Sequence, residues 1–205
     1  YYLSKKFKVD LFEQEDYFGG HSCTYDIKKE QKNIPVDLGF IVFNELTYPN
    51  LLNFFKELEV PFEKSDMSFA VSIQGSNIEY GGRGLKAIFA NKSNIFNFNF
   101  VKMIIEIVSF YKKAPLLIKN NLDGETLGSY LDKSNFSKYL VEYHIIPMVA
   151  AIWSMPFSKA KEIPLKLFLN FFINHGLFKL RNRPQWYTVT DRSRTYVKKV
   201  LNKIS

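Results

Sequence analysis

The segment VDLFEQEDYFGGHS, residues 9–22, restricts the possible folds more than any other part of this chain. Residues 9–12 predict a short buried strand that ends at the acidic residue Glu13. Gly19 and Gly20 follow, and they predict a tight turn because glycine adopts left-handed backbone angles without a steric penalty. Residues 1–8, with lysines near their end, predict the last turns of a helix ahead of the strand. This order is typical of an α/β fold.

Glu13 is placed where α/β folds that bind dinucleotides commonly have an acid. There the carboxylate ends the second strand and accepts hydrogen bonds from the ribose hydroxyls. The helix before it would present its N-terminus to the pyrophosphate, but no G-x-G-x-x-G motif precedes Glu13 in this sequence. An acid and a glycine turn after a strand also occur without any ligand. The residues alone therefore leave a purely structural role open.

Composition narrows the class of protein. The 205 residues can form one large domain or parts of two, and 46% hydrophobic residues are ample for a packed core. No apolar run reaches the ~18 residues that a bilayer span needs, and no signal sequence opens the chain. The single cysteine, Cys23, excludes an internal disulfide. These features predict a cytoplasmic protein, with peripheral contact to the inner face of the membrane as an option.

The net charge of +8 is spread along the chain, with a denser basic run over residues 179–199. Such a run is either a solvated face or a contact for an anionic lipid or phosphate group. The sequence has no zinc-finger spacing and no ribonucleoprotein motif, so no nucleic-acid partner is expected. His21, His144 and His175 are far apart and lack ligand spacing, so no metal site is expected.

Periodicity and turn residues predict the remaining elements. Short strands or extended loops are expected up to residue 44, and a helix near Pro49 covers residues 51–58. A pair of strands is expected at residues 68–73 and 77–82. Further helices are expected at residues 99–111 (stopping before Pro115), 137–153 (kinked or broken at Pro147) and 165–174 (capped by Gly176). A strand at 185–189 and a basic helix at 192–204 follow.

Several segments together resemble the flavin-containing amine oxidoreductases and their phytoene desaturase relatives. They include LFEQEDYFGGHS, PVDLGFIVFNELTYPNLLNFFKELEVPFEKSDMSFAVS, EYGGRGLKAIFA and SRTYV. These segments look like a bacterial subgroup of FAD-dependent oxidoreductases described as predicted NAD/FAD-binding proteins. The resemblance implies FAD as cofactor and a chain that is the central portion of a longer oxidoreductase, without its glycine-rich turn.

The same resemblance implies a fold and a domain order. The fold class is α/β, with α+β character in an insertion. Residues 1–45 would be a partial Rossmann-like FAD/NAD(P)-binding domain, residues 46–176 a mostly helical substrate domain, and residues 177–205 a return toward the first domain. An apolar, Phe-rich insertion suits a lipid or another apolar substrate.

The resemblance also implies roles for particular residues. Glu13 would bind the ribose, and the turn of Gly19, Gly20, His21 and Ser22 would pass the pyrophosphate. Asp37, Gly39 and Phe40 would lie along the flavin side of the cofactor. Two departures stand out: His21 replaces the usual arginine, and Thr190-Asp191-Arg192 replaces a common glycine pair.

Tyr80 and Arg83, in the motif YGGRG, are expected near the substrate or the flavin edge. Trp153 and Trp186 are weaker candidates for the same role, with core packing as the alternative. No catalytic acid–base pair is identifiable, which flavin chemistry does not require because the cofactor accepts the electrons. The alternative function is a non-catalytic remnant or a module that binds lipid or a protein partner.

Overall fold

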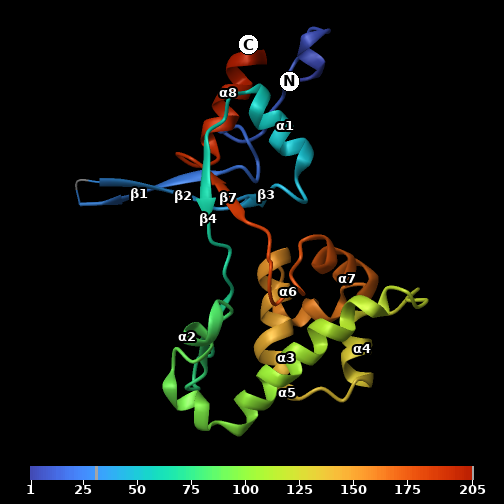
Figure 1. The fold of residues 1–205 in the computed structure, drawn as a ribbon. Coiled ribbons are helices and arrows are strands. Elements are labelled where there is room, and N and C mark those ends of the chain that lie inside the picture. The colour runs from blue at the N-terminus through green and yellow to red at the C-terminus, as the bar shows by residue number, and fades with distance from the viewer. Residues whose placement is uncertain (31, 205) are drawn as a thin grey trace. The chain divides into compact units, whose positions relative to one another are not determined.

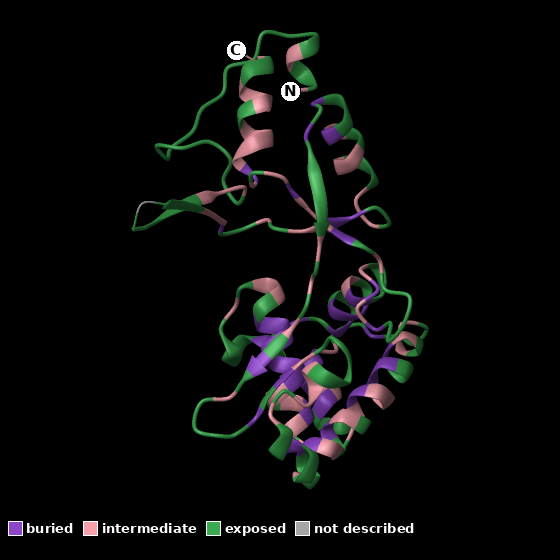
Figure 2. Ribbon diagram, turned by 60° about the vertical axis from the view of Figure 1, so that its left-hand side comes forward, coloured by how far each residue is buried: buried purple, intermediate pink, exposed green. Residues whose placement is uncertain are grey.

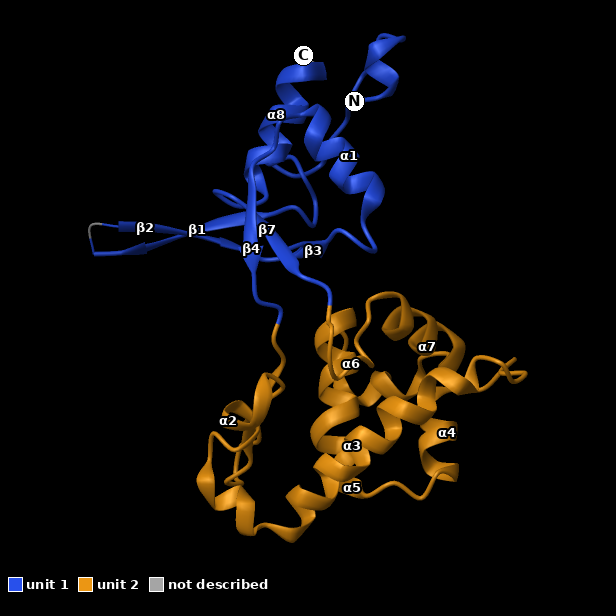
Figure 3. Cartoon of the chain, viewed as in Figure 1, with its two compact units in different colours: residues 1–67, 184–205 blue, residues 68–183 orange. Residues whose placement is uncertain are grey.

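The computed structural model describes residues 1–30 and 32–204 and shows a mixed α/β protein (Figure 1). The chain forms two compact units (Figure 3). Unit 1 comprises Tyr1–Met67 and Pro184–Ser205, and unit 2 comprises Ser68–Arg183. The expected boundaries were 45/46 and 176/177. The observed division lies further along the chain because helix α1 (Pro49–Glu57) and strand β4 (Phe62–Ser65) pack and pair within unit 1.

A three-stranded antiparallel sheet lies at the centre of unit 1. Strand β7 (Trp186–Val189) lies between β3 (Phe43–Asn44) and β4, with Phe43 opposite Tyr187 and Phe62 opposite Val189. Side chains from α1 and the sheet form a core of Phe43, Phe55, Leu58, Val60 and Val189. Helix α8 (Arg194–Ile204) contributes Tyr196 and Val200 to the edge of this core. The predicted strand at residues 185–189 and the predicted C-terminal helix are therefore confirmed.

Strands β1 (Thr24–Lys29) and β2 (Lys32–Asp37) form an antiparallel hairpin in unit 1, with Thr24 opposite Asp37. The segment before the hairpin differs from the prediction. It contains only a short 3₁₀ helix, η1 (Leu3–Lys5), and residues 9–12 are not a strand. No strand of the described residues pairs with residues 9–12, so their backbone groups lack the neighbour that defines a strand. Phe12 is consequently 91% exposed.

Unit 2 begins with the predicted strand pair, β5 (Ala70–Ser72) and β6 (Glu79–Gly81), which is antiparallel with Val71 opposite Tyr80. The helices follow in order: α2 (Gly84–Ile88), η2 (Lys92–Phe96), α3 (Phe98–Leu117), α4 (Leu127–Lys133), α5 (Lys138–Leu140), η3 (Val141–Ile145), α6 (Ile146–Trp153), η4 (Phe157–Glu162) and α7 (Leu165–Asn174). None of these helices, nor any other in residues 1–30 and 32–204, is both long and apolar enough to cross a membrane.

Helix α3 organises the core of unit 2 because its apolar residues recur at helical spacing. Phe100, Met103, Ile107, Phe110 and Ala114 are all buried along one face. They pack with residues of α6 and α7, and Figure 2 shows the buried positions concentrated on the inner faces of these helices. The mostly helical character expected for this part of the chain is thus a consequence of one amphipathic helix and its partners.

Two prolines have different effects on the helices of unit 2. No break occurs at Pro147, because helical residues continue from α5 through the π-helical turn η3 into α6; the helix is instead distorted just before Pro147, which stands in the first turn of α6. The predicted stop before Pro115 is wrong, because α3 continues through Pro115 to Leu117. Pro115 lies in the last turn of α3, and because it has no N–H group one backbone hydrogen bond of that turn is missing. The neighbouring residue Ala114 is buried in the core, and this packing keeps the turn helical.

Candidate functional site

The glycine turn and the segment that follows β2 lie directly against each other in unit 1. The backbone N–H of Phe40 donates to the His21 carbonyl at 2.9 Å, and that of Leu38 donates to the Cys23 carbonyl at 2.9 Å. The structure therefore brings together the turn of Gly19, Gly20, His21 and Ser22 and the segment of Asp37, Gly39 and Phe40. The family resemblance assigns both segments to one cofactor site.

Helix α8 forms the third side of this arrangement. The hydroxyls of Ser22 and Tyr196 share a hydrogen bond. A Cβ atom added to Gly19 would lie 3.1 Å from Cγ2 of Val197. The turn is thus packed on the first turns of α8, and the absence of a side chain at Gly19 permits that packing.

The glycines of the site differ in what surrounds them. A Cβ atom on Gly39 would lie 2.1 Å from the carbonyl oxygen of His21. The backbone of His21 therefore lies against Gly39 where any other residue would have its side chain. Gly20 has a φ of +55° and nothing within 4 Å of the position that a Cβ would occupy. Gly20 therefore confirms the predicted left-handed turn, and one side of its backbone is open.

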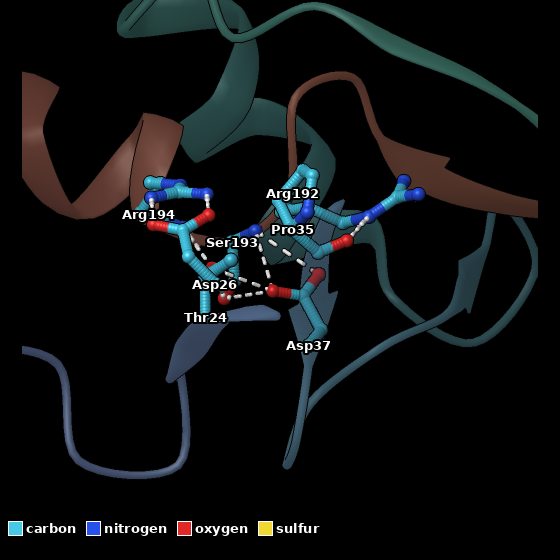
Figure 4. A network of polar contacts seen from close by, with 7 residues as sticks. All are labelled: Thr24, Asp26, Pro35, Asp37, Arg192, Ser193 and Arg194. Atoms are coloured by element: carbon cyan, nitrogen blue, oxygen red, sulfur yellow. Dashed lines mark hydrogen bonds and ion pairs between the residues drawn. The ribbon is translucent and has the colours of Figure 1, made fainter. Parts of the chain in front are cut away.

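Asp37 anchors the start of α8 through its buried carboxylate (Figure 4). Its Oδ1 accepts hydrogen bonds from Thr24 Oγ1 at 2.6 Å and from Ser193 Oγ at 2.8 Å. The backbone N–H of Ser193 donates to both carboxylate oxygens at 3.1 Å. Because Ser193 directly precedes α8, the negative charge lies at the positive end of the helix dipole, where it stabilises the helix.

Two arginines close the network around Asp37. Arg194 makes a bidentate ion pair with Asp26, at 2.7 and 2.5 Å, and this hydrogen-bonded guanidinium lowers the pKa of the Asp26 carboxyl. The Nε of Arg192 donates to the Pro35 carbonyl at 3.1 Å. These contacts were not anticipated from the sequence because Arg194 and Asp26 are 168 positions apart.

The turn from β7 into α8 has a conformation that favours glycine although it contains none. Asp191 and Arg192 have φ angles of +61° and +76°. The family resemblance implies a glycine pair at this turn, and the backbone has a glycine-like shape although two side chains are present. Left-handed angles at non-glycine residues cost on the order of 1 kcal/mol each, and the contacts of Arg192 and Ser193 hold them in place.

Glu13 is exposed and lies in a bend of its own. Its Oε1 accepts hydrogen bonds from the backbone N–H groups of Gln14 at 2.7 Å and Glu15 at 3.1 Å. The nearby Cys23 thiol raises the pKa of the Tyr17 hydroxyl, and the negative charges of Glu15 and Glu13 raise it further. The segment that contains Glu13 thus runs close to the glycine turn. Within the described residues, Glu13 is not hydrogen-bonded to the Asp37 network.

The four substrate candidates are divided between the two units, with Tyr80, Arg83 and Trp153 in unit 2 and Trp186 in unit 1. Tyr80 is buried in the core of unit 2, and Arg83 is exposed just before α2. Trp153 packs on Phe171 and Phe172, with ring centroids 4.8 and 6.4 Å apart. Trp186 belongs to β7 in unit 1 and is 8% exposed. Each of the three aromatic candidates is engaged in core packing of its own unit.

A buried polar network that the sequence did not predict surrounds His144 in unit 2. The Tyr80 hydroxyl donates to the Tyr143 carbonyl at 2.7 Å and lies 2.9 Å from His144 Nδ1. The Tyr111 hydroxyl lies 3.0 Å from His144 Nε2. Since the single proton of Tyr80 is used for the carbonyl, we assign the imidazole proton to Nδ1, with Nε2 accepting from Tyr111.

Burial sets the protonation of this network. It lowers the pKa of His144 to about 3, so the imidazole is neutral near pH 7. Burial also raises the pKa of the Tyr80 and Tyr111 hydroxyls above their usual value. The three side chains satisfy one another, so His144 is a hydrogen-bonded structural histidine. The described residues contain no group of three or more His, Cys, Asp or Glu placed to hold a metal ion.

Comparison with known proteins adds one finding. Residues 1–58 match the family described as an NAD(P)-binding Rossmann-like domain. The matched region contains Glu13, the glycine turn and the Asp37–Phe40 segment, and it implies a nucleotide cofactor, consistent with an oxidoreductase. No curated protein matches the chain.

Proposed function

We propose that this chain is part of an FAD-dependent oxidoreductase of the amine oxidase-like class. The main support is the convergence of the Gly19–Gly20 turn and the Asp37–Phe40 segment at the start of α8, inside the region that matches a nucleotide-binding domain. These are the segments that the family resemblance assigns to one FAD site. When bound, FAD accepts a hydride or electrons from the substrate.

The residues of the site fit a dinucleotide in specific ways. The open side of Gly20 allows a phosphate to approach the backbone, which a Cβ atom would obstruct. The imidazole of His21 can donate one hydrogen bond in place of the usual arginine. The Asp37 carboxylate is compensated by Ser193, Thr24 and the N-terminus of α8, which limits its repulsion of an anionic ligand.

The proposed substrate is a lipid or another apolar molecule bound by unit 2. This part of the proposal rests on the family resemblance and on the large apolar content of the helices of unit 2. The role of the chain's residues in the reaction would be to bind, orient and exclude water, since the cofactor supplies the redox chemistry.

A comparison of two glycine variants tests the cofactor site. Gly20 and Gly75 both have positive φ angles, +55° and +78°, and at both nothing lies within 4 Å of the position that a Cβ would occupy. Alanine therefore imposes the same kind of backbone strain at either position. We expect Gly20→Ala to weaken FAD binding by the purified chain about ten-fold or more, while Gly75→Ala leaves it unchanged. Flavin fluorescence quenching in an FAD titration measures both.

A pair of exposed acids provides a second comparison. Glu13→Gln should weaken FAD binding because the ribose hydroxyls lose a charged acceptor, and Glu15→Gln should not. Binding of NADH or NADPH without any binding of FAD would show that the flavin assignment is wrong. Equal effects of Gly20→Ala and Gly75→Ala would show that the turn does not contact the cofactor.

The second candidate is a non-catalytic module that binds lipid or a protein partner. Its support is the unpaired backbone of residues 9–12 among the described residues and the side chains at Asp191 and Arg192 where related sequences commonly have glycines. Failure to bind FAD, NADH and NADPH, together with binding of lipid vesicles, would favour this candidate over the oxidoreductase.

A further inference from the structure

One end of unit 2 exposes large apolar side chains together with basic ones. We define the apolar–basic surface by the residues of α2, η2 and the first turns of α3 that are exposed there: Leu85, Lys86, Lys92, Ile95, Phe96, Phe98 and Lys102. Figure 1 shows η2 and the start of α3 at one extremity of this unit. Leu85, Phe96 and Phe98 are 74%, 91% and 79% exposed.

These exposed side chains project from a well-packed base. The side chain of Asn91 accepts from Ser93 N at 3.1 Å at the start of η2, and that of Asn97 accepts from Phe100 N at 3.1 Å at the start of α3. Buried Asn94 donates to the Glu79 carbonyl at 3.3 Å. These three asparagines fix the backbone of residues 91–98, so the outward position of Phe96 and Phe98 is built into the fold.

Phenylalanines of the same segments divide into two sets. Phe89 and Phe100 pack edge to face, with ring centroids 6.1 Å apart, in the core of unit 2. Phe96 and Phe98 remain outside it. On α3, Phe98, Lys102 and Ile105 share one exposed face, because they are four and seven residues apart. The apolar–basic surface therefore continues along the first two turns of that helix.

The charged residues of α2 and η2 have a single sign, whereas Lys102 on α3 forms an ion pair with Glu106 at 4.0 Å. Residues 80–105 contain the basic residues Arg83, Lys86, Lys92 and Lys102 and no Asp or Glu. Phe and Leu side chains of an interfacial surface insert at the boundary between headgroups and acyl chains, and lysine stems lie along apolar surface while their ammonium groups reach phosphate. We propose that the apolar–basic surface docks unit 2 on an anionic phospholipid membrane. This proposal does not depend on the flavin assignment.

Three alternatives fit less well: a dimer through this surface, docking through α8, and docking through the segment around Phe12. A two-fold dimer through this surface would bring the same basic patch of two copies face to face, which is electrostatically unfavourable. The basic helix α8 is a second cationic surface, but its apolar residues Tyr196 and Val200 pack at the core of unit 1. Phe12 is exposed as fully as Phe96, yet it lies among Asp10, Glu13 and Glu15. Of these described surfaces, that of unit 2 combines both features.

Co-sedimentation with vesicles tests the docking surface with the full chain. We expect binding to vesicles of equal phosphatidylglycerol and phosphatidylcholine at about 100 mM salt, and much weaker binding to pure phosphatidylcholine or at about 500 mM salt. The double variant Phe96→Ser/Phe98→Ser should lower the partition constant roughly ten-fold or more. Its matched control is Phe12→Ser, at a side chain of equal exposure in an acidic setting.

A second pair of variants separates the two basic surfaces. Lys86→Gln/Lys92→Gln should lower binding to the anionic vesicles about ten-fold, whereas Lys198→Gln/Lys203→Gln in α8 should change it little. All four lysines lie outside the hydrophobic cores, so folding should be preserved, which circular dichroism verifies.

Three results would overturn the proposal. The first is the absence of binding to anionic vesicles at the lower salt concentration. The second is an equal loss of binding in Phe12→Ser or in the α8 variant. The third is self-association in sedimentation velocity that Phe96→Ser/Phe98→Ser abolishes in the absence of lipid, which would assign the surface to a second copy of the chain.

Discussion

At the scale of single residues, Tyr80 and Pro147 show how a local defect is compensated by a distant side chain. Pro147 has no N–H group, so it cannot donate to the carbonyl of Tyr143 four residues earlier. The Tyr80 hydroxyl donates to that carbonyl instead, at 2.7 Å. The same hydroxyl then accepts from the neutral His144, whose other nitrogen accepts from Tyr111. The missing N–H of Pro147 and the buried histidine are therefore served by one network.

The buried His144 makes the stability of unit 2 depend on pH. Its pKa is about 3 in the fold, against 6.5 for an ordinary histidine, so the unfolded chain takes up a proton first. The stabilisation is complete above about pH 6.5, falls as the pH drops toward 3, and is level below that. Between about pH 7.5 and pH 5 we expect a loss of roughly 2 kcal/mol in the free energy of unfolding.

Urea denaturation of variants at several pH values measures this effect. His144→Gln keeps a donor and an acceptor but has no proton to gain, so it should remove most of the loss. His21→Gln, at an exposed histidine, is the control and should retain it. The same pH dependence in both variants would show that His144 is not its source.

In unit 1, the stability should depend in a similar way on one buried polar side chain, the carboxylate of Asp37. Asp37→Asn replaces one acceptor oxygen with an amide that faces the Ser193 N–H, and it removes the charge at the start of α8. We expect a loss of about 2–3 kcal/mol in the free energy of unfolding of unit 1. Asp10→Asn, at an exposed acid, should cost less than about 0.5 kcal/mol. Equal stability of the two variants in urea denaturation would contradict the anchoring role of Asp37.

At the scale of elements, the helix ends are determined largely by local side chains. Asn97, Thr126 and Ser137 precede α3, α4 and α5, and each side-chain oxygen accepts a backbone N–H of the first turn. At the other end of a helix, Gly176 follows α7 with a φ of +65°, and Leu177 N donates to the Phe172 carbonyl at 2.9 Å. Caps of this kind explain why α3 begins, and why α7 ends, close to the predicted positions.

The cap at Asn97 is testable with a neighbouring asparagine as control. Asn97→Ala should lower the free energy of unfolding of unit 2 by about 1 kcal/mol, because Phe100 N–H loses its acceptor. Asn99→Ala changes an exposed asparagine inside the helix, where alanine is favourable, and should be neutral or slightly stabilising. Thermal unfolding followed by circular dichroism compares the two. A cost at Asn99 equal to that at Asn97 would contradict the capping assignment.

At the scale of the whole molecule, the chain has two separate hydrophobic cores. The larger cluster, around Phe110 and Phe168, lies within unit 2, and the smaller one, around Phe43 and Phe55, lies within unit 1. Each unit also contains one of the two tryptophans, Trp186 in unit 1 and Trp153 in unit 2. Separate cores favour separate unfolding transitions, and the tryptophans provide a reporter for each.

Single-tryptophan variants test whether the units unfold independently. In the Trp153→Phe background, Asp37→Asn should lower the midpoint that Trp186 fluorescence reports. In the Trp186→Phe background, the same substitution should leave the Trp153 midpoint within about 1 °C, while Asn97→Ala should lower it by a few degrees. A common shift of both reporters for either substitution would show one cooperative unit instead of two.

Local patterns predicted most elements of this chain correctly, and the failures have physical reasons. The helices at residues 49–57 and 165–174 and the strand pair of unit 2 follow from apolar periodicity and turn residues. Residues 9–12 have a strand-like composition but no partner strand among the described residues. Pro115 shows the converse, since tertiary packing continues a helix past a residue that disfavours it.

The sequence by itself determined the longer helices, the cap at Gly176 and the left-handed turn at Gly20, because these depend on neighbours a few positions apart. Only the tertiary structure decided that Asp37 caps α8 through Ser193, 156 positions away, and that Gly39 lies against His21. It also decided the network of Tyr80, Tyr111 and His144. Such contacts form where burial makes an unpaired polar group costly, and no local pattern specifies which distant group will satisfy it.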